Sequence, residues 1–331
     1  MVLSAFALSA LLLSAASQPA PSPAAPAADE AIPLVSPPPP DISDLPAGST
    51  AVKLIPVETR MSVEVMINGA GPFPFIVDSG ASRTVISGSL ARLLGLPSNG
   101  PVQIHSVGGT STVPSVRIDR LSIGGLPPST IMAPVLREND LGALGILGID
   151  VLADKRVVLD FDKNRMTIER AVENHPRIAP NEIVVTAKRR FGQLVLVNAD
   201  ADGQHIYAIV DTGSAVTIGN TSLRSRLLHH RDWQTYPVKI HDVTGREVPA
   251  IYGTAGDIRI GSIKVRHIVA AFCDADAFDR FQLRNKPAML LGMDLLRGFR
   301  RVSIDFANKR VALLLDASAI DARPVMSISG R

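Results

Sequence analysis

The sequence has little cysteine, few aromatic residues and almost no net charge. A single cysteine, Cys273, excludes an internal disulfide and a cysteine-rich metal site. The net charge of +3 is too small to predict nucleic-acid binding, although the calculated pI is about 9.2. Aromatic residues make up only 4%, whereas glycine and proline number 25 each, which favours many turns and short strands. With 331 residues, the chain is long enough for two domains.

Long uncharged apolar runs are also absent after the N-terminal region, so we expect no integral membrane segment in the mature chain. Residues 1–17 are typical of a secretory signal peptide, with an apolar stretch from Phe6 to Leu13 and small residues from Ser14 to Ala16 for cleavage. No Lys or Arg precedes the apolar stretch, which leaves open a short N-terminal tail without a targeting role. The signal peptide predicts an exported protein, either periplasmic or secreted.

The next segment is compositionally biased. Residues 18–50 are rich in proline and alanine and include four consecutive prolines, Pro37 to Pro40. Such a composition builds no core and predicts a disordered linker, with a pro-segment as the alternative. We predict an N-terminal lobe over 51–172, an interlobe linker over 173–182, a C-terminal lobe over 183–318 and a tail over 319–331.

One short motif occurs twice. Residues 75–81 read Phe-Ile-Val-Asp-Ser-Gly-Ala, and residues 208–214 read Ala-Ile-Val-Asp-Thr-Gly-Ser. In each copy an apolar run, typical of a buried strand although a helix stays open, ends in a carboxylate, a hydroxyl and a glycine. The glycine permits a tight exit from the strand. Two such carboxylates, Asp78 and Asp211, suggest a catalytic pair.

The similarity of the two halves extends beyond the motif. Asp78 and Leu94 are sixteen residues apart, as are Asp211 and Leu227, and this fixed spacing indicates an internal repeat. A short helix is predicted after each motif. The candidate N-cap residues of these helices are Ser87, Ser89 and Asn220.

Each repeat continues with a predicted hairpin, at 104–109 and 240–245. The hairpin tips are candidates for flaps that close over a bound peptide, with two ordinary β-turns as the alternative. The flap candidates are Val107, Gly108, Gly109, Val243, Thr244 and Gly245. An apolar-apolar-Gly element follows in each repeat, at Gly148 and Gly292, and we interpret the aspartates after it, Asp150 and Asp294, as helix caps.

At these residues the chain resembles the retropepsin and pepsin-like aspartic peptidases, and most closely the bacterial retropepsin-like proteins with two lobes in one chain. The shared features are the doubled Asp-Ser/Thr-Gly motif, the glycine hairpin and the later apolar-apolar-Gly element, in family order over about residues 52–316. The resemblance implies an all-β fold of two similar β-barrel lobes, related by a pseudo-twofold axis with the active-site cleft between them.

The resemblance also implies that Asp78 and Asp211 meet across that axis and share one proton. Two carboxylates in contact cannot both ionise cheaply, so their pKa values separate. The ionised member would activate a water and the protonated member would donate to the substrate carbonyl. The family's pattern assigns Ser79 and Thr212 to bracing the two loops, and Gly80 and Gly213 to keeping the backbone close to the carboxylates.

The two motifs differ at their last position, where Ala81 corresponds to Ser214. In related enzymes a hydroxyl at this position can hydrogen-bond the aspartate and favour its charged form. We therefore expect Asp211 to be the more readily ionised member, with Ala81 and Ser214 both supporting the active-site loops.

These features together predict an exported aspartic endopeptidase that acts on peptide or protein substrates, without a cofactor or bound metal. His105 and His241 occupy matching hairpin positions and are interpreted as polar surface residues, and Cys273 as a buried small residue. We expect a monomer, because one chain supplies both half-sites, although pairing between chains is an alternative. A non-catalytic peptide-binding or scaffold protein that kept the fold is the alternative function.

Overall fold

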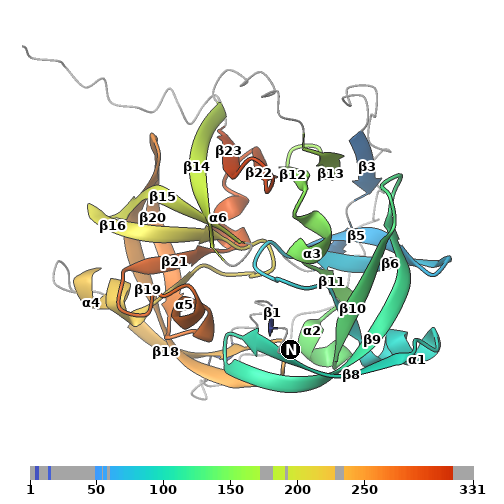
Figure 1. Cartoon of the computed structure of the whole chain (residues 1–331). Coiled ribbons are helices and arrows are strands. Elements are labelled where there is room, and N and C mark those ends of the chain that lie inside the picture. The colour runs from blue at the N-terminus through green and yellow to red at the C-terminus, as the bar shows by residue number, and fades with distance from the viewer. Residues whose placement is uncertain are drawn as a thin grey trace, which may run out of the picture.

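The computed structural model describes residues 60–171, 182–190, 193–227 and 235–315, together with the short segments 4–6, 14–15, 49–53 and 55–57. The described chain is mostly strand, arranged as two lobes joined by a sheet (Figure 1). Most of the predicted signal peptide, the 18–50 linker, the 173–182 linker and the 319–331 tail lie outside the described residues. Within the described ranges, no helix has both the length and the apolar character needed to cross a membrane.

The first lobe is a closed barrel of six strands, on the right in Figure 1. Its ring closes because β9 pairs on one side with β10 and on the other with β5. In ring order the strands are β5 (Arg60–Ile67), β6 (Ala70–Val77), β11 (Gly145–Leu147), β7 (Val85–Ser87), β10 (Ser129–Leu136) and β9 (Gly109–Ile123).

The second lobe repeats this ring strand for strand, on the left in Figure 1. It closes in the same way, because β19 pairs with both β20 and β15. In the corresponding order the strands are β15 (Gln193–Ala201), β16 (Gln204–Val210), β21 (Ala288–Leu291), β17 (Ile218–Gly219), β20 (Ile263–Phe272) and β19 (Glu247–Ile260). The predicted fold class, all-β with two similar lobes, is confirmed.

Short helices and edge strands complete each lobe. The helices are α1 (Gly88–Leu93), α2 (Glu138–Leu141) and α3 (Ile149–Leu152) in the first lobe, and α4 (Thr221–Leu227), α5 (Asp276–Arg280) and α6 (Met293–Leu296) in the second. The edge strands of the two hairpins are β8 (Ser98–Ser106) and β18 (Thr235–His241), which pair with β1 (Ser4–Phe6) and β2 (Ser14–Ala15), while β4 (Ile55–Val57) pairs with β5.

Two of the predicted helix caps are present. The hydroxyl of Ser87 accepts a hydrogen bond from the backbone N–H of Leu90 at 3.2 Å. The Oδ1 atom of Asn220 accepts one from the N–H of Leu223 at 2.9 Å. Each cap satisfies an N–H that the first turn of a helix otherwise leaves unpaired, and so fixes where α1 and α4 begin.

The lobes are joined by six further strands, which continue the sheet of the second lobe through the pairing of β14 (Glu182–Arg190) with β15 and follow the pseudo-twofold symmetry of the lobes. At their centre β12 (Lys155–Asp160) runs antiparallel to its counterpart β22 (Arg301–Asp305), with Val158 opposite Ser303. Val157 pairs with Ile304 and Leu159 with Val302, so the register is the same on both sides of a pseudo-twofold axis through the Val158–Ser303 pair. The sheet is extended by β13 (Arg165–Arg170) and β3 (Ser49–Lys53) on one side, and by β23 (Arg310–Leu314) and β14 on the other.

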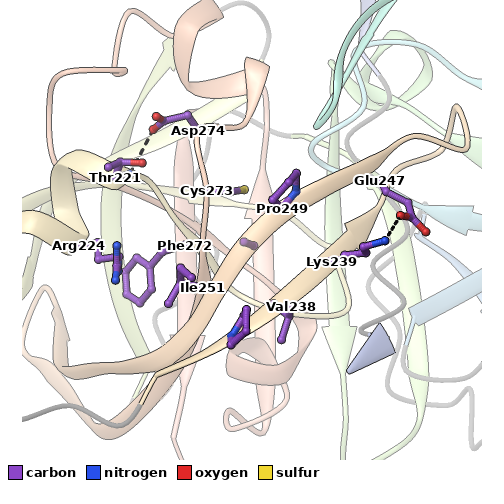
Figure 2. A pocket seen from close by; sticks show the side chains of 12 residues that line it. Thr221, Arg224, Val238, Lys239, Glu247, Pro249, Ile251, Phe272, Cys273 and Asp274 are labelled. Atoms are coloured by element: carbon purple, nitrogen blue, oxygen red, sulfur yellow. Dashed lines mark hydrogen bonds and ion pairs between the residues drawn. The ribbon is translucent and has the colours of Figure 1, made fainter. Parts of the chain in front are cut away.

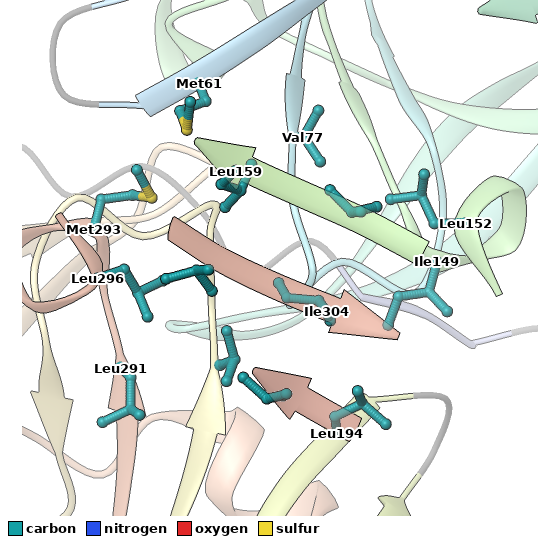
Figure 3. Packing of buried hydrophobic residues seen from close by; sticks show 14 of the residues in the cluster. Met61, Val77, Ile149, Leu152, Leu159, Leu194, Leu291, Met293, Leu296 and Ile304 are labelled. Carbon is teal, nitrogen blue, oxygen red and sulfur yellow. The ribbon is translucent and has the colours of Figure 1, made fainter. Parts of the chain in front are cut away.

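One hydrophobic cluster runs from each barrel into the joining sheet. Figure 3 shows Leu159 and Ile304 of the sheet, with Val77 from the first lobe and Leu291 from the second nearby. All four side chains are at most 2% exposed. Because burial of apolar surface is the main favourable term in folding, this continuous core fixes the lobes against each other and so positions the two motifs.

Candidate active site

The two aspartates are placed by the same local construction in each lobe. The strand β6 that leads into Asp78 runs parallel to β11, and the N–H of Asp78 donates to the carbonyl of Leu147 at 3.0 Å. In the second lobe β16 runs parallel to β21, and the N–H of Asp211 donates to Leu291 at 3.0 Å. The predicted apolar-apolar-Gly elements are therefore the strands that hold the aspartates at the ends of buried strands.

Asp78 and Asp211 lie together at the interface between the lobes. Both are 0% exposed. Gly80 fits against both: its N–H donates to Asp78 Oδ1 at 2.7 Å, and a Cβ atom at this position would lie 2.6 Å from Asp211 Oδ1. A side chain here would push the carboxylates apart, so the predicted role of Gly80 in keeping the backbone close agrees with the geometry.

The hydroxyls of Ser79 and Thr212 brace the two loops reciprocally. Ser79 Oγ donates to the carbonyl of Val210, and Thr212 Oγ1 donates to the carbonyl of Val77, both at 2.8 Å. Each hydroxyl also accepts the backbone N–H of the opposite residue, at 2.9 Å for Thr212 Oγ1 and 3.1 Å for Ser79 Oγ. These buried contacts lock the aspartate loops into one unit across the pseudo-twofold axis.

The surroundings of the two carboxylates differ. Asp78 Oδ1 accepts the N–H groups of Gly80 and Ala81, at 2.7 and 2.9 Å. Asp211 also has two backbone donors, the N–H groups of Gly213, at 3.1 Å, and Ser214, but its Oδ2 is buried with no donor in the part of the chain that the structure describes. Burial first, and then the neighbouring Asp78 carboxylate, raise the pKa of Asp211 well above its usual value. A protonated Asp211 donating to Asp78 satisfies both groups.

The expectation that Ser214 makes Asp211 the more readily ionised member is wrong. Its hydroxyl donates to the carbonyl of Val216 at 2.7 Å instead of contacting the carboxylate. Ala81 has no hydroxyl but donates its backbone N–H to Asp78. The shorter backbone hydrogen bonds to Asp78, and the unpaired Oδ2 of Asp211, favour Asp78 as the charged member, and the side-chain identities do not reveal either difference.

The prediction that Asp150 and Asp294 are helix caps is also wrong. The N-cap positions of α3 and α6 are Gly148 and Gly292. Asp150 instead accepts hydrogen bonds from the N–H and hydroxyl of Thr84, at 2.9 and 2.7 Å. Asp294 accepts the corresponding pair from Thr217, at 3.0 and 2.7 Å.

Thr84 and Thr217 were not identified from the sequence, although they recur at the same distance after each aspartate. Their hydroxyls also accept the N–H groups of Gly148 and Gly292, at 3.1 and 3.2 Å. A threonine six residues after each motif aspartate is the signal that could have found them. Each threonine–aspartate pair anchors the far end of an aspartate loop, to α3 in the first lobe and to α6 in the second.

The tips of the two predicted flap hairpins meet. Asp242 Oδ2 accepts the hydroxyl of Ser106 at 2.6 Å and the N–H of Gly108 at 3.0 Å. Arg246 donates to the carbonyls of Gly108 and Thr110, both at 3.0 Å. The two hairpins are therefore connected lobe to lobe by a buried aspartate and an arginine.

Each tip also inserts a valine into the opposite lobe. Val107, 3% exposed, packs in a cluster with Ile209 and Ile218 of the second lobe. Val243, 0% exposed, packs in a cluster with Ile76 and Ala81 of the first. Among the remaining flap candidates, Gly109 and Gly245 have positive φ values, 114° and 80°, a conformation that favours glycine. The N–H of Thr244 donates a hydrogen bond to Asp242.

The other candidates lie away from the aspartate pair. His105 Nδ1 contacts Asp276 at 2.9 Å, and the described residues contain no group of three or more potential ligands placed to hold a metal ion. Cys273 is buried as expected, and burial followed by the charge of Asp274 raises the pKa of its thiol to about 12. Cys273 lines a cavity of about 670 Å³ in the second lobe, between α4 and the β18–β19 hairpin (Figure 2).

A family model described as aspartyl protease matches the chain in two regions, residues 63–151 and 197–295, which together span more than half of it. Each region contains one Asp-Ser/Thr-Gly motif, one hairpin and one apolar-apolar-Gly element, and so corresponds to one lobe. No curated protein matches the chain. The chain therefore belongs to the aspartyl protease family, as a retropepsin-like protein with both lobes in one polypeptide.

Proposed function

We propose that this protein is an exported aspartic endopeptidase in which Asp78 and Asp211 activate a water molecule for attack on a peptide bond. The observation that carries the proposal is the buried contact of the two carboxylates on loops that brace each other. Membership of the aspartyl protease family supports peptide or protein substrates. The predicted signal peptide supports export to the periplasm or beyond.

The asymmetry of the pair assigns the two chemical roles. Asp78, with two backbone donors on one oxygen, is the ionised general base that takes a proton from the attacking water. Asp211, whose pKa is raised, is the general acid that donates its proton to the substrate carbonyl oxygen as the tetrahedral intermediate forms. In the second step the C–N bond breaks, Asp78 returns its proton to the leaving amine, and Asp211 recovers one from the intermediate.

Substrate entry requires the hairpin tips to separate. Both carboxylates are fully buried, and the tips are connected through Asp242 and Arg246. We propose that the structure represents the closed form, and that opening lets an extended peptide enter beneath the two hairpins. Such a peptide would bind as an added strand, which makes the sequence preference modest. One chain supplies both half-sites, so the active form is a monomer.

The deciding experiment is digestion of a peptide library by the purified protein from pH 3 to 8, read by mass spectrometry, beside Asp211→Asn. Cleavage that disappears in the variant supports the proposal and gives the specificity in the same data. Equal cleavage by both proteins indicates a contaminating protease. Lack of cleavage by the folded wild-type protein, together with peptide binding, would favour the alternative of a non-catalytic peptide-binding protein.

A further inference from the structure

Gln193 is a buried polar residue that joins the second lobe to the aspartate loop of the first. It is the first residue of β15 and is only 1% exposed. Its Nε2 atom donates a hydrogen bond to the carbonyl of Gly80, across the lobe interface. The carbonyl can only accept, so the amide nitrogen must face Gly80, and this fixes the orientation of the Gln193 side chain.

That carbonyl belongs to the same peptide group as an N–H that contacts Asp78. The carbonyl of Gly80 and the N–H of Ala81 are the two ends of one planar peptide unit. The Ala81 N–H donates to Asp78 Oδ1 at 2.9 Å. A continuous line of hydrogen bonds therefore runs from the Gln193 amide through one peptide to the Asp78 carboxylate.

Donation to a peptide carbonyl polarises the peptide and strengthens the hydrogen bond that its N–H donates. It also limits rotation of the peptide plane, which keeps the N–H directed at the carboxylate. A stronger donor to Asp78 favours its charged form. Through the Gly80–Ala81 peptide, Gln193 thus acts on the charge of an aspartate in the opposite lobe.

The oxygen of the same amide suggests that this contact is not present for stability alone. Gln193 Oε1 is buried and has no hydrogen-bond partner within the described part of the chain. Leaving a buried acceptor unpaired is unfavourable, and a methionine of similar length would avoid it. The equivalent position in the first repeat, eighteen residues before the motif aspartate, is Arg60, so the amide is particular to the second repeat.

We propose that Gln193 is a positioning residue, which holds the Gly80–Ala81 peptide so that its N–H points at Asp78 and keeps Asp78 as the ionised member of the pair. The inference rests on the proposed function. Among the described residues, the groups that face the pair also include the backbone N–H groups of Gly213 and Ser214 on Asp211, and the hydroxyls of Ser79 and Thr212 at the loop bases.

The charges near the pair are few. Of the described residues, Asp78 is the charged group that acts on Asp211, and the raised pKa of Asp211 agrees with a proton held on that side. Arg83, the next charged residue along the first loop, acts on Asp150. A change in the ionisation of the pair on substitution of neutral Gln193 would therefore be transmitted through the Gly80–Ala81 peptide.

The test compares Gln193→Met with Gln193→Glu in the full chain. Methionine cannot donate, so the acidic limb of the kcat/KM profile should move to higher pH by about half a unit to one unit. A glutamic acid can donate only while protonated, so Gln193→Glu should keep most activity at the acidic end and lose it as the new carboxyl ionises. A purely structural role would lower Tm without moving the acidic limb.

A second readout does not depend on turnover. The carboxyl carbon resonances of Asp78 and Asp211, followed by NMR against pH in the wild type and in Gln193→Met, report the apparent pKa values of the pair. If the lower of the two apparent pKa values is higher in the variant than in the wild type, the inference is supported. It is supported even if no peptide is cleaved, and in that case only the proposed function is contradicted. Superimposable titrations and pH profiles in a folded variant would overturn the role of Gln193.

Discussion

The two aspartate loops follow equivalent strands and have the same pattern of bracing hydrogen bonds, yet they hold their carboxylates differently. Ser79 and Thr212 exchange equivalent hydrogen bonds, and both aspartates are fully buried. The backbone hydrogen bonds to Asp78, at 2.7 and 2.9 Å, are shorter than the one from Gly213 to Asp211, at 3.1 Å, and Asp211 keeps one oxygen without a donor among the described residues. A pseudosymmetric fold can thus assign different charges to two identical residues through small differences in backbone donors.

The largest effect should come from removing either carboxylate, and the two variants should differ in stability. Asp78→Asn and Asp211→Asn should each lower kcat/KM by about 10²- to 10⁴-fold, the usual size of a lost general acid or base. In Asp211→Asn the amide can still donate to Asp78 without needing a proton. This variant should therefore be more stable than the wild type at neutral pH.

The sign of the pH dependence follows from the raised pKa of Asp211. Between its unfolded pKa, about 3.9, and its higher folded value, the native state binds more protons than the unfolded state. Wild-type stability should then fall as pH rises through the folded pKa, and Asp211→Asn should lack this fall. Thermal unfolding of the wild type and both variants from pH 4 to 8 measures this fall in stability. Each kcal/mol of lost stability should lower Tm by about 2–4 °C. A wild-type excess in Tm that grows with pH would contradict the assignment.

The repeated architecture could be predicted from the sequence because each repeat carries its own local signals. Each of these signals lies within a few residues of sequence: the apolar run before Asp78, the capping residue Ser87 and the glycine of the hairpin. Each of them has a counterpart in the second half of the chain. The meeting of Asp78 and Asp211 came from family resemblance, because no local pattern specifies a contact between loops 133 residues apart.

The roles of Asp150 and Gln193 could not be predicted for the same reason, because their partners are distant in the sequence. Asp150 lies near a glycine at the start of a short helix, so the local sequence favours a helix cap. Its carboxylate instead accepts hydrogen bonds from Thr84, 66 residues earlier in the chain. The sequence does not reveal the role of Gln193, because its partner, Gly80, is 113 residues away and lies in the other lobe. Ser214 is a different case: its position in the motif predicts a contact with Asp211, but its hydroxyl donates to a backbone carbonyl only two residues away.

A smaller effect is expected at the glycines that begin α3 and α6. A Cβ atom at Gly148 would lie 2.4 Å from the backbone carbon of Arg83, and one at Gly292 would lie 2.4 Å from that of Val216. Because the backbone must move to accept it, Gly148→Ala and Gly292→Ala should each lower stability by about 1–3 kcal/mol. Their aspartate loops should shift as well, which lowers kcat.

The control for these glycines is Gly88→Ala, where the nearest atom to the added Cβ is the mobile end of the Arg92 side chain, at 3.3 Å. Denaturant unfolding of the three variants gives the comparison, and Gly88→Ala should be close to the wild type. Equal losses at Gly148 and Gly292 would extend the symmetry of the lobes to their energetics. A large loss at one glycine with none at the other would show that the lobes accommodate this contact differently.

The smallest effect is expected where the two motifs differ in sequence. Ser214→Ala removes a hydrogen bond to the carbonyl of Val216, so it should cost about 0.5–1.5 kcal/mol of stability. The acidic limb of the pH–rate profile should not move, because the hydroxyl does not contact Asp211. The reciprocal change, Ala81→Ser, places a hydroxyl at a fully buried position in an apolar cluster, where a group without a partner costs about 1–3 kcal/mol. An upward shift of the acidic limb in Ser214→Ala would mean that the hydroxyl turns to Asp211 in the working enzyme. The backbone donors to Asp78 would then no longer account for the asymmetry of the pair by themselves.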